Sequence, residues 1–313
     1  NKLWRMEKMK VLMSKTFTKM FKVLPFVIIS ILSGLLGFLF SNIYENLTRN
    51  VLTFDSFSNN ILNTYSLFAF MIIAGIMIWV ICSNCATGLF ASEIHEGTMR
   101  LLLSKEISRF DLVLSKILGM LLGSFVYLIN SFSGFMLVFC LFTDVEKDIL
   151  LLIIKATILF IIYGIVVIFI VGGIGTFLSS VFKKKVPAIL IMICLGGLIF
   201  GIVPILRIIL ISQGYYNQFH LYFLDINYHF GLIFNNFLTM LGDLSLSQNV
   251  NQLFTIFTNI YTQGTGDIDI ILNNSSYFVI NNSLNSLVIM ISYIIGAIAL
   301  YGLSFRIMMK KDI

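Results

Sequence analysis

Two carboxylates and an imidazole lie within four residues of one another, in a polar connection between two long apolar segments. They belong to Glu93, His95 and Glu96. A His-Glu pair can bind catalytic zinc when a second histidine follows four residues after the first, but Met99 occupies that position. Paired carboxylates also serve intramembrane proteolysis, but no apolar segment carries a matching histidine. These residues therefore favour a contact surface, or a plain interfacial loop, over an enzyme active site.

A second candidate for chemistry is the pair formed by Cys82 and Cys85, which lies inside an apolar segment. No second cysteine pair and no histidine lies nearby, so we expect no metal or redox site there. The chain has four cysteines, too few to define a disulfide framework.

The composition indicates an integral membrane protein. Of the 313 residues, 58% are hydrophobic and 12% are charged, whereas a soluble domain has about a quarter charged residues. The mean hydropathy is +0.96. The net charge of +6 comes from short segments between apolar runs, where Lys and Arg set membrane orientation. We therefore expect the lipid bilayer, and no nucleic acid, as a partner.

Six segments are long and apolar enough to cross a bilayer, which takes about twenty residues. They lie at about Val23–Ile43, Ser66–Phe90, Leu112–Phe142, Ile149–Phe182, Pro187–Ser212 and Leu284–Met308. With six spans, 17 of the 21 Lys and Arg residues fall on one side, which predicts that both termini are cytoplasmic. Lys155 and Arg207 fall near the other ends of their spans, where we expect them to extend to the lipid headgroups.

The segment Phe219–Leu241 has apolar residues at helical spacing. A seventh span here would move the basic C-terminal residues outside and bury polar residues such as Asp225 and His229 in hydrocarbon. We therefore predict that residues 213–283 form an extracytoplasmic insert with a turn at Gly264–Asp267. Its helix would lie on the outer leaflet, cap the bundle or meet a partner.

The predicted fold is an all-α integral membrane protein with six transmembrane helices. Residues 1–22 form an interfacial amphipathic helix, with apolar and basic residues on opposite faces. Residues 23–212 contain the first five spans and a short cytoplasmic helix at 92–110, residues 213–283 the insert, and residues 284–313 the sixth span and a cytoplasmic tail. Small residues at close-packing spacing, such as Gly37, Gly119, Gly197 and Gly201, favour helix contacts.

The connection between spans two and three has the pattern of a compact amphipathic helix lying across the span ends. Glu93 and Glu96 share a face if span two continues as helix. Gly97 then supplies a break and Thr98 a possible N-cap. An apolar face follows, formed by Met99, Leu102, Leu103, Ile107 and Phe110.

The run E-I-H-E-G-T-M-R-L-L-L-S-K-E-I-S-R at positions 93–109, followed by Lys116, resembles the connection typical of ABC-2 type permeases, the membrane subunits of ATP-binding cassette exporters. The matching positions are Glu93, Glu96, Gly97, Thr98, Leu102, Leu103, Ser104, Ser108, Arg109 and Lys116. The resemblance extends to the N-terminal helix, the six spans and the cytoplasmic ends. It does not cover the long insert, and Glu106 stands where the family often has proline.

The resemblance implies two paired permease subunits, as a homodimer or heterodimer, above two P-loop ATPase subunits. ATP and Mg²⁺ would bind to the ATPase, and this chain would hold no cofactor. The absence of a GxxxxGK[ST] motif agrees, since the chain has no phosphate-binding loop of its own. The implied ATPase-coupling residues are Glu93, Glu96, Gly97, Thr98, Met99, Arg100, Leu102, Ser104 and Arg109. Glu93 and Glu96 would contact basic groups on the ATPase or orient the connection, and Met99 and Leu102 would fill a groove.

Polar residues at membrane depth are candidates for a substrate path. They are Ser83, Asn84, Asn130, Ser131 and Ser133. Ordinary hydrogen bonds between helices are the alternative role for them.

No acid or base lies in the middle of a predicted span, so we expect an apolar or amphipathic substrate: a peptide, an antibiotic or a lipid. The residue usage is typical of low-GC bacteria, which suggests a bacterial plasma membrane. Two other functions stay open at this point: a non-transporting membrane component for sensing or assembly, and an ATP-independent carrier.

Overall fold

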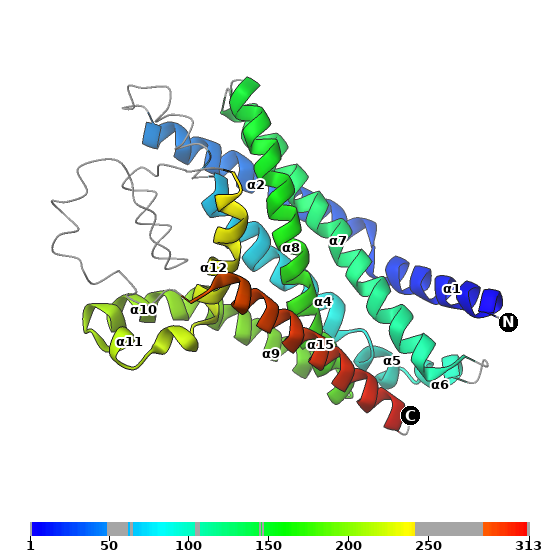
Figure 1. Cartoon of the computed structure of the whole chain (residues 1–313). Helices are drawn as coiled ribbons and strands as arrows, with labels where there is room; N and C mark the ends of the chain where they lie inside the picture. The colour runs from blue at the N-terminus through cyan, green and yellow to red at the C-terminus, as the bar shows by residue number, and fades with distance from the viewer. Residues whose placement is uncertain are drawn as a thin grey trace.

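The computed structural model describes residues 2–48, 62, 65–103, 107–143, 145, 147–241 and 284–311, and these residues form helices without a strand (Figure 1). Six helical segments are long and apolar enough to cross a membrane, which agrees with the six predicted. They are Val23–Asn42, within α2 (Val23–Thr48); Tyr65–His95, with η1 (Ala69–Met77), α4 (Ile78–Thr87) and α5 (Ala91–His95); α7 (Arg109–Phe142); α8 (Lys147–Val181); Lys185–Ser212, with α9 (Lys185–Gly197), η2 (Leu198–Ile202) and α10 (Val203–Ser212); and α15 (Ser286–Lys310).

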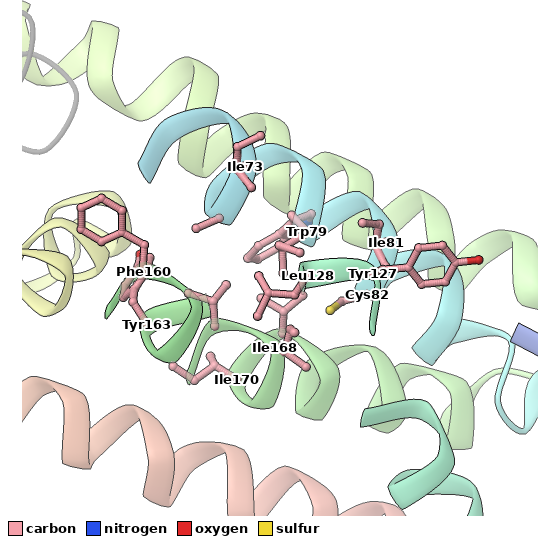
Figure 2. Close-up of a cluster of buried hydrophobic side chains, with 14 of the residues drawn as sticks. Ile73, Trp79, Ile81, Cys82, Tyr127, Leu128, Phe160, Tyr163, Ile168 and Ile170 are labelled. Carbon is pink, nitrogen blue, oxygen red and sulfur yellow. The ribbon is translucent and has the colours of Figure 1, made fainter. Parts of the chain in front are cut away.

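Spans two, three and four form the centre of the bundle. Each is more than half buried, whereas spans one, five and six are mostly exposed. Figure 2 shows part of the apolar core, which extends from Phe160 and Tyr163 on α8 to Leu128 and Tyr127 on α7, beside Trp79 of α4. The two long helices α7 and α8 thus provide the surface on which the outer helices pack.

Helix α1 (Lys2–Met20) precedes the first span and packs along α7, as does α2. Two glycines allow these close approaches. A Cβ on Gly37 would lie 2.7 Å from the Phe135 carbonyl oxygen, and one on Gly119 would lie 2.8 Å from the Met13 carbonyl oxygen. The predicted packing role is confirmed at these two positions. At Gly197 and Gly201 an added Cβ would meet nothing within 4 Å.

Spans two and five each contain a wide π-helical turn, η1 and η2, and the two turns lie side by side. A Cβ on Gly75 of η1 would come within 2.8 Å of the Phe200 ring in η2. Next to them, the indole nitrogen of Trp79 donates a hydrogen bond to the Met192 carbonyl oxygen at 2.7 Å. Spans two and five are therefore joined at the point where both depart from α-helical geometry.

The described part of the insert contains three short elements. They are α11 (Tyr215–Gln218), η3 (Leu221–Phe223) and α12 (Ile226–Thr239). The prediction of one helix over Phe219–Leu241 is wrong in its first part, because the chain turns at His220, where φ is 50°. The Asp225 side chain then caps α12 by accepting a hydrogen bond from the Tyr228 amide at 2.9 Å. The turn expected at Gly264–Asp267 lies outside the described residues.

Helix α12 packs into the bundle against α8 and α15. Its Phe234 side chain is fully buried, with its ring beside those of Phe70, Phe160 and Tyr163. Of the three placements considered for this helix, the contacts correspond to a cap on the bundle.

The expectation that Arg207 extends to the lipid headgroups is wrong. Its side chain is 2% exposed, because the insert folds back over the end of α10. Its Nε donates to Asp225 Oδ2 at 2.6 Å, and its Nη2 donates to Asp225 Oδ1 at 3.0 Å and to Asn227 Oδ1 at 2.7 Å. The Tyr216 hydroxyl donates to Asp225 Oδ2 at 2.9 Å. This buried ion pair ties the start of α12 to span five.

Replacing Arg207 with methionine would leave the Asp225 carboxylate buried without its cation, which is strongly destabilising. We expect the backbone amides of α12 to lose protection against hydrogen exchange by about tenfold or more, while those of α7 keep theirs. Lys155→Met is the control, because it removes an exposed cation from α8. Equal α12 protection in the two variants would mean that apolar packing alone holds α12.

Candidate functional site

The connection between spans two and three lies at the end of the bundle where both chain termini lie (Figure 1). We call this end the basic end, defined by α1, α5, α6 (Thr98–Leu103) and the last turn of α15. The predicted break at Gly97 is confirmed, because its φ of +70° is a conformation that favours glycine. Thr98 is the first residue of α6, and its hydroxyl donates to the Glu93 carbonyl oxygen at 3.4 Å.

Glu93 is buried and forms an ion pair with Lys116 of α7. Its second oxygen lies 3.7 Å from Lys19 Nζ of α1. Lys116 is 3% exposed, and its Nζ also donates to the Leu89 carbonyl oxygen at 3.2 Å. Of the two roles considered for Glu93, this geometry corresponds to orienting the connection, since its oxygens face the chain's own lysines.

Two further contacts, which sequence reasoning missed, tie α5 to span four. The Ser179 hydroxyl of α8 accepts hydrogen bonds from the Phe90 amide at 2.9 Å and the Ala91 amide at 3.1 Å. These amides begin α5, where backbone donors otherwise lack partners. A serine in an apolar helix carries no sequence signal for a contact 89 residues away.

Arg109 joins the connection to the last span. Its Nη1 donates to the carbonyl oxygens of Met309 at 2.9 Å and Lys311 at 3.1 Å, where α15 ends. Cations stabilise such helix C-termini. Lys311 Nζ in turn donates to the Ser180 carbonyl oxygen of α8 at 2.7 Å. Burial lowers the pKa of Lys311, and the charge of Lys183 acts in the same direction.

The next helix begins with a defined cap at Ser108. Its hydroxyl accepts from the Asp111 amide at 3.1 Å and donates to Asp111 Oδ2 at 2.6 Å. Span three therefore begins at Arg109, and Phe110 is its second residue. From this first position of the span, Arg109 reaches the end of α15.

The prediction that Met99 fills a groove in a partner is wrong for this structure. Its side chain is 1% exposed and lies in the chain's own apolar core. Leu102 is half-buried against the same core. Ser104 and the side chain of Arg100 lie outside the described residues. Among the described residues from Ser92 to Ser108, the exposed ones are His95, Glu96, Gly97 and Ser108, and we call the first three the tip of the connection.

The residues considered for a substrate path bond mainly to the chain itself. Asn130 joins spans one and three, because its Oδ1 accepts from the Ser30 hydroxyl at 2.9 Å and its Nδ2 donates to the Phe26 carbonyl oxygen at 3.4 Å. The hydroxyls of Ser83 and Ser131 donate to carbonyl oxygens of their own helices. These contacts correspond to the alternative of ordinary helix hydrogen bonding.

The other two residues of that set differ. Asn84 is exposed, and its Oδ1 accepts from Lys185 Nζ at 2.6 Å. Ser133 is half-buried on α7.

Asn84 also lines a cavity of about 530 Å³ at the basic end, between α1, α4 and α7. Five lysines line it: Lys15, Lys19, Lys22, Lys116 and Lys185. Sequence reasoning missed this cavity. The available signal was the spacing of Lys15 and Lys19, four residues apart on one side of α1, with Lys22 following just after the helix ends at Met20.

Residues 7–313 match the model of a protein family described as ABC-2 family transporter protein. A search of curated proteins found no match.

Replacing Glu93 with glutamine would leave the Lys116 ammonium buried beside a neutral partner. We expect the free energy of unfolding to fall by about 3 kcal/mol, measured by thermal unfolding in detergent micelles. Adding Lys116→Met should recover more than half of the loss, because apolar groups can replace a buried ion pair. Glu96→Gln at the exposed tip is the control, with an effect below about 0.5 kcal/mol. If the loss of unfolding free energy in the double variant equals the sum of the losses in the two single variants, the two groups act independently.

Proposed function

The chain belongs to the ABC-2 transporter family as the membrane-spanning permease subunit of an ATP-binding cassette transporter, and we propose that it moves an apolar or amphipathic substrate outward across a bacterial plasma membrane. The substrate would be a peptide, an antibiotic or a lipid. Both termini and the basic end would face the cytoplasm, in keeping with the Lys and Arg bias.

The energy would come from another polypeptide. Membership in the family implies association with ATP-binding cassette ATPases, and the chain has no GxxxxGK[ST] motif. ATP and Mg²⁺ would therefore bind to the ATPase. A second permease subunit, identical or related, would complete the membrane part of the complex.

The observation that carries the proposal is the construction of the connection at the basic end. Its tip at His95, Glu96 and Gly97 is exposed, whereas its inner side is bonded to three spans. Glu93 binds α7 through Lys116, the start of α5 binds α8 through Ser179, and the end of the connection binds α15 through Arg109. A displacement of the tip by an ATPase would therefore move the ends of spans three, four and six together.

Glu96 is the residue of the tip best suited to bind the ATPase. Its carboxylate can accept hydrogen bonds from basic groups of the partner, and such charge-assisted bonds are stronger than neutral ones. In contrast to Glu93, it is exposed.

The substrate class is supported by the interior of the spans. The polar side chains of Ser83, Asn130 and Ser131 bond within the chain. The described core between α4, α7 and α8 is otherwise mainly apolar, which suits an apolar or amphipathic substrate better than a hydrophilic ion.

The experiment purifies the tagged chain gently from its native membrane and quantifies the bound P-loop ATPase by mass spectrometry. We expect Glu96→Ala to lower the retained ATPase by about tenfold, the effect of removing one charge-assisted hydrogen bond. Glu7→Ala is the control, because Glu7 is also exposed and lies on α1, outside the tip.

Three outcomes would contradict the proposal. Repeated recovery of the intact chain without any ATPase, under conditions that preserve known complexes, would favour one of the two other functions. Transport of a labelled amphipathic peptide or phospholipid into liposomes by the purified chain alone would identify an ATP-independent carrier. Export that continues unchanged when the ATPase is inactivated would identify a non-transporting sensing or assembly component.

A further inference from the structure

The lysine-lined cavity at the basic end is a candidate binding site that borders the connection and shares Glu96 with its exposed tip. Its volume of about 530 Å³ falls within the range of small-molecule sites, about 300–1,000 Å³. The cavity exists because α1, α2 and α4 all pack against α7, while α1 and α2 make few contacts with α4. A space therefore remains between α4 and the pair formed by α1 and α2.

The polar part of the cavity has an excess of positive charge. Five lysines line it, compared with two carboxylates, those of Glu93 and Glu96. Glu93 already neutralises Lys116. Among the described residues, Lys15 and Lys22 have no ion-pair partner, and both side chains are exposed. The α1 side of the cavity thus presents ammonium groups available to an anion.

The rest of the wall is apolar and leads toward the spans. Pro25 and Ile29 of α2 lie on one side, and Val80 and Ile81 of α4 on the other. Val80 is 57% exposed, so the wall continues into the apolar outer surface of span two. The cavity is therefore cationic next to α1 and apolar next to the membrane-spanning surface.

We propose that this cavity binds one anionic glycerophospholipid of the surrounding bilayer. The lipid phosphate would lie among Lys15, Lys19 and Lys22, since lysine binds phosphate as a compact point charge. The first carbons of an acyl chain would lie between Ile29 and Val80. This proposal concerns binding alone and does not depend on transport or on an ATPase.

A soluble phosphate compound fits the site less well than a lipid. Such a compound would use the lysines but would leave Ile29 and Val80 without an apolar partner. It also lacks the anchoring in the bilayer that brings an anionic lipid beside basic residues at the membrane surface. The combination of both surfaces in one cavity is the reason for assigning a lipid.

The experiment measures binding of fluorescent phosphatidylglycerol and phosphatidylcholine to the purified full chain in neutral detergent. In the cavity variant, Lys15, Lys19 and Lys22 are replaced by glutamine. In the control variant, Lys10, Lys183 and Lys184 are replaced by glutamine, which removes the same charge from α1 and from residues just before α9, outside the cavity lining. A double variant, Lys15→Gln with Lys22→Gln, preserves the contact between Lys19 and Glu93.

We expect the wild-type chain to prefer phosphatidylglycerol. The cavity variant should bind it about tenfold more weakly, the double variant should show most of this loss, and the control should stay within about twofold of wild type. All variants should elute as single peaks with unchanged helix content. If the cavity variant does not fold, the double variant decides the question.

Three results would overturn the proposal. Equal weakening in the cavity and control variants would show that general surface charge attracts the lipid. Equal binding of the two lipids by the wild-type chain would show that the headgroup charge is not recognised. Displacement of phosphatidylglycerol by an equal concentration of glycerol phosphate would show that the site takes a soluble phosphate and makes no use of the acyl chain.

Discussion

The buried ion pair between Glu93 and Lys116 determines how the basic end is built. Removing two charges from water costs free energy, which is recovered only when the pair is close and its remaining hydrogen-bonding groups are satisfied. Here Lys116 also bonds to the Leu89 carbonyl oxygen, and Glu93 also lies near Lys19. The pair therefore fixes the rotation of α5 relative to α7. With Glu93 turned inward, the chain reverses at Gly97 and leaves Glu96 at the exposed tip.

The spans and the break in the connection could be predicted because their causes are local. Transfer of about twenty apolar residues into hydrocarbon depends on composition alone, and a glycine is suited to a left-handed turn wherever it stands. The sequence did not predict that Glu93 is buried and Glu96 exposed, because this difference depends on the position of Lys116, which lies on another span. The same reason applies to Met99, which packs in the core, and to Arg207, whose carboxylate partner follows after a turn at His220.

Two features depend on pairs of helices and have no signal in either helix alone. The wide turns η1 and η2 face each other, with Gly75 against the Phe200 ring. The lysine-lined cavity likewise needs α1 and α4 to stand apart on α7. Hydropathy describes how each segment meets lipid. It does not describe how two segments of similar hydropathy meet each other.

The packing of α12 has a consequence for the architecture of the whole chain. The described segment after α10 turns at His220 and adds α12 to the bundle, and the last span, α15, begins at Ser286. A loop that begins and ends on one side of a bilayer does not change whether the chain crosses the bilayer an even or an odd number of times, whatever the length of the loop. Each doubling of a loop adds only about 0.6 kcal/mol of closure entropy. If residues 213–283 form the extracytoplasmic insert that the sequence predicts, a change in its length after α12 would not reverse the direction of the last span.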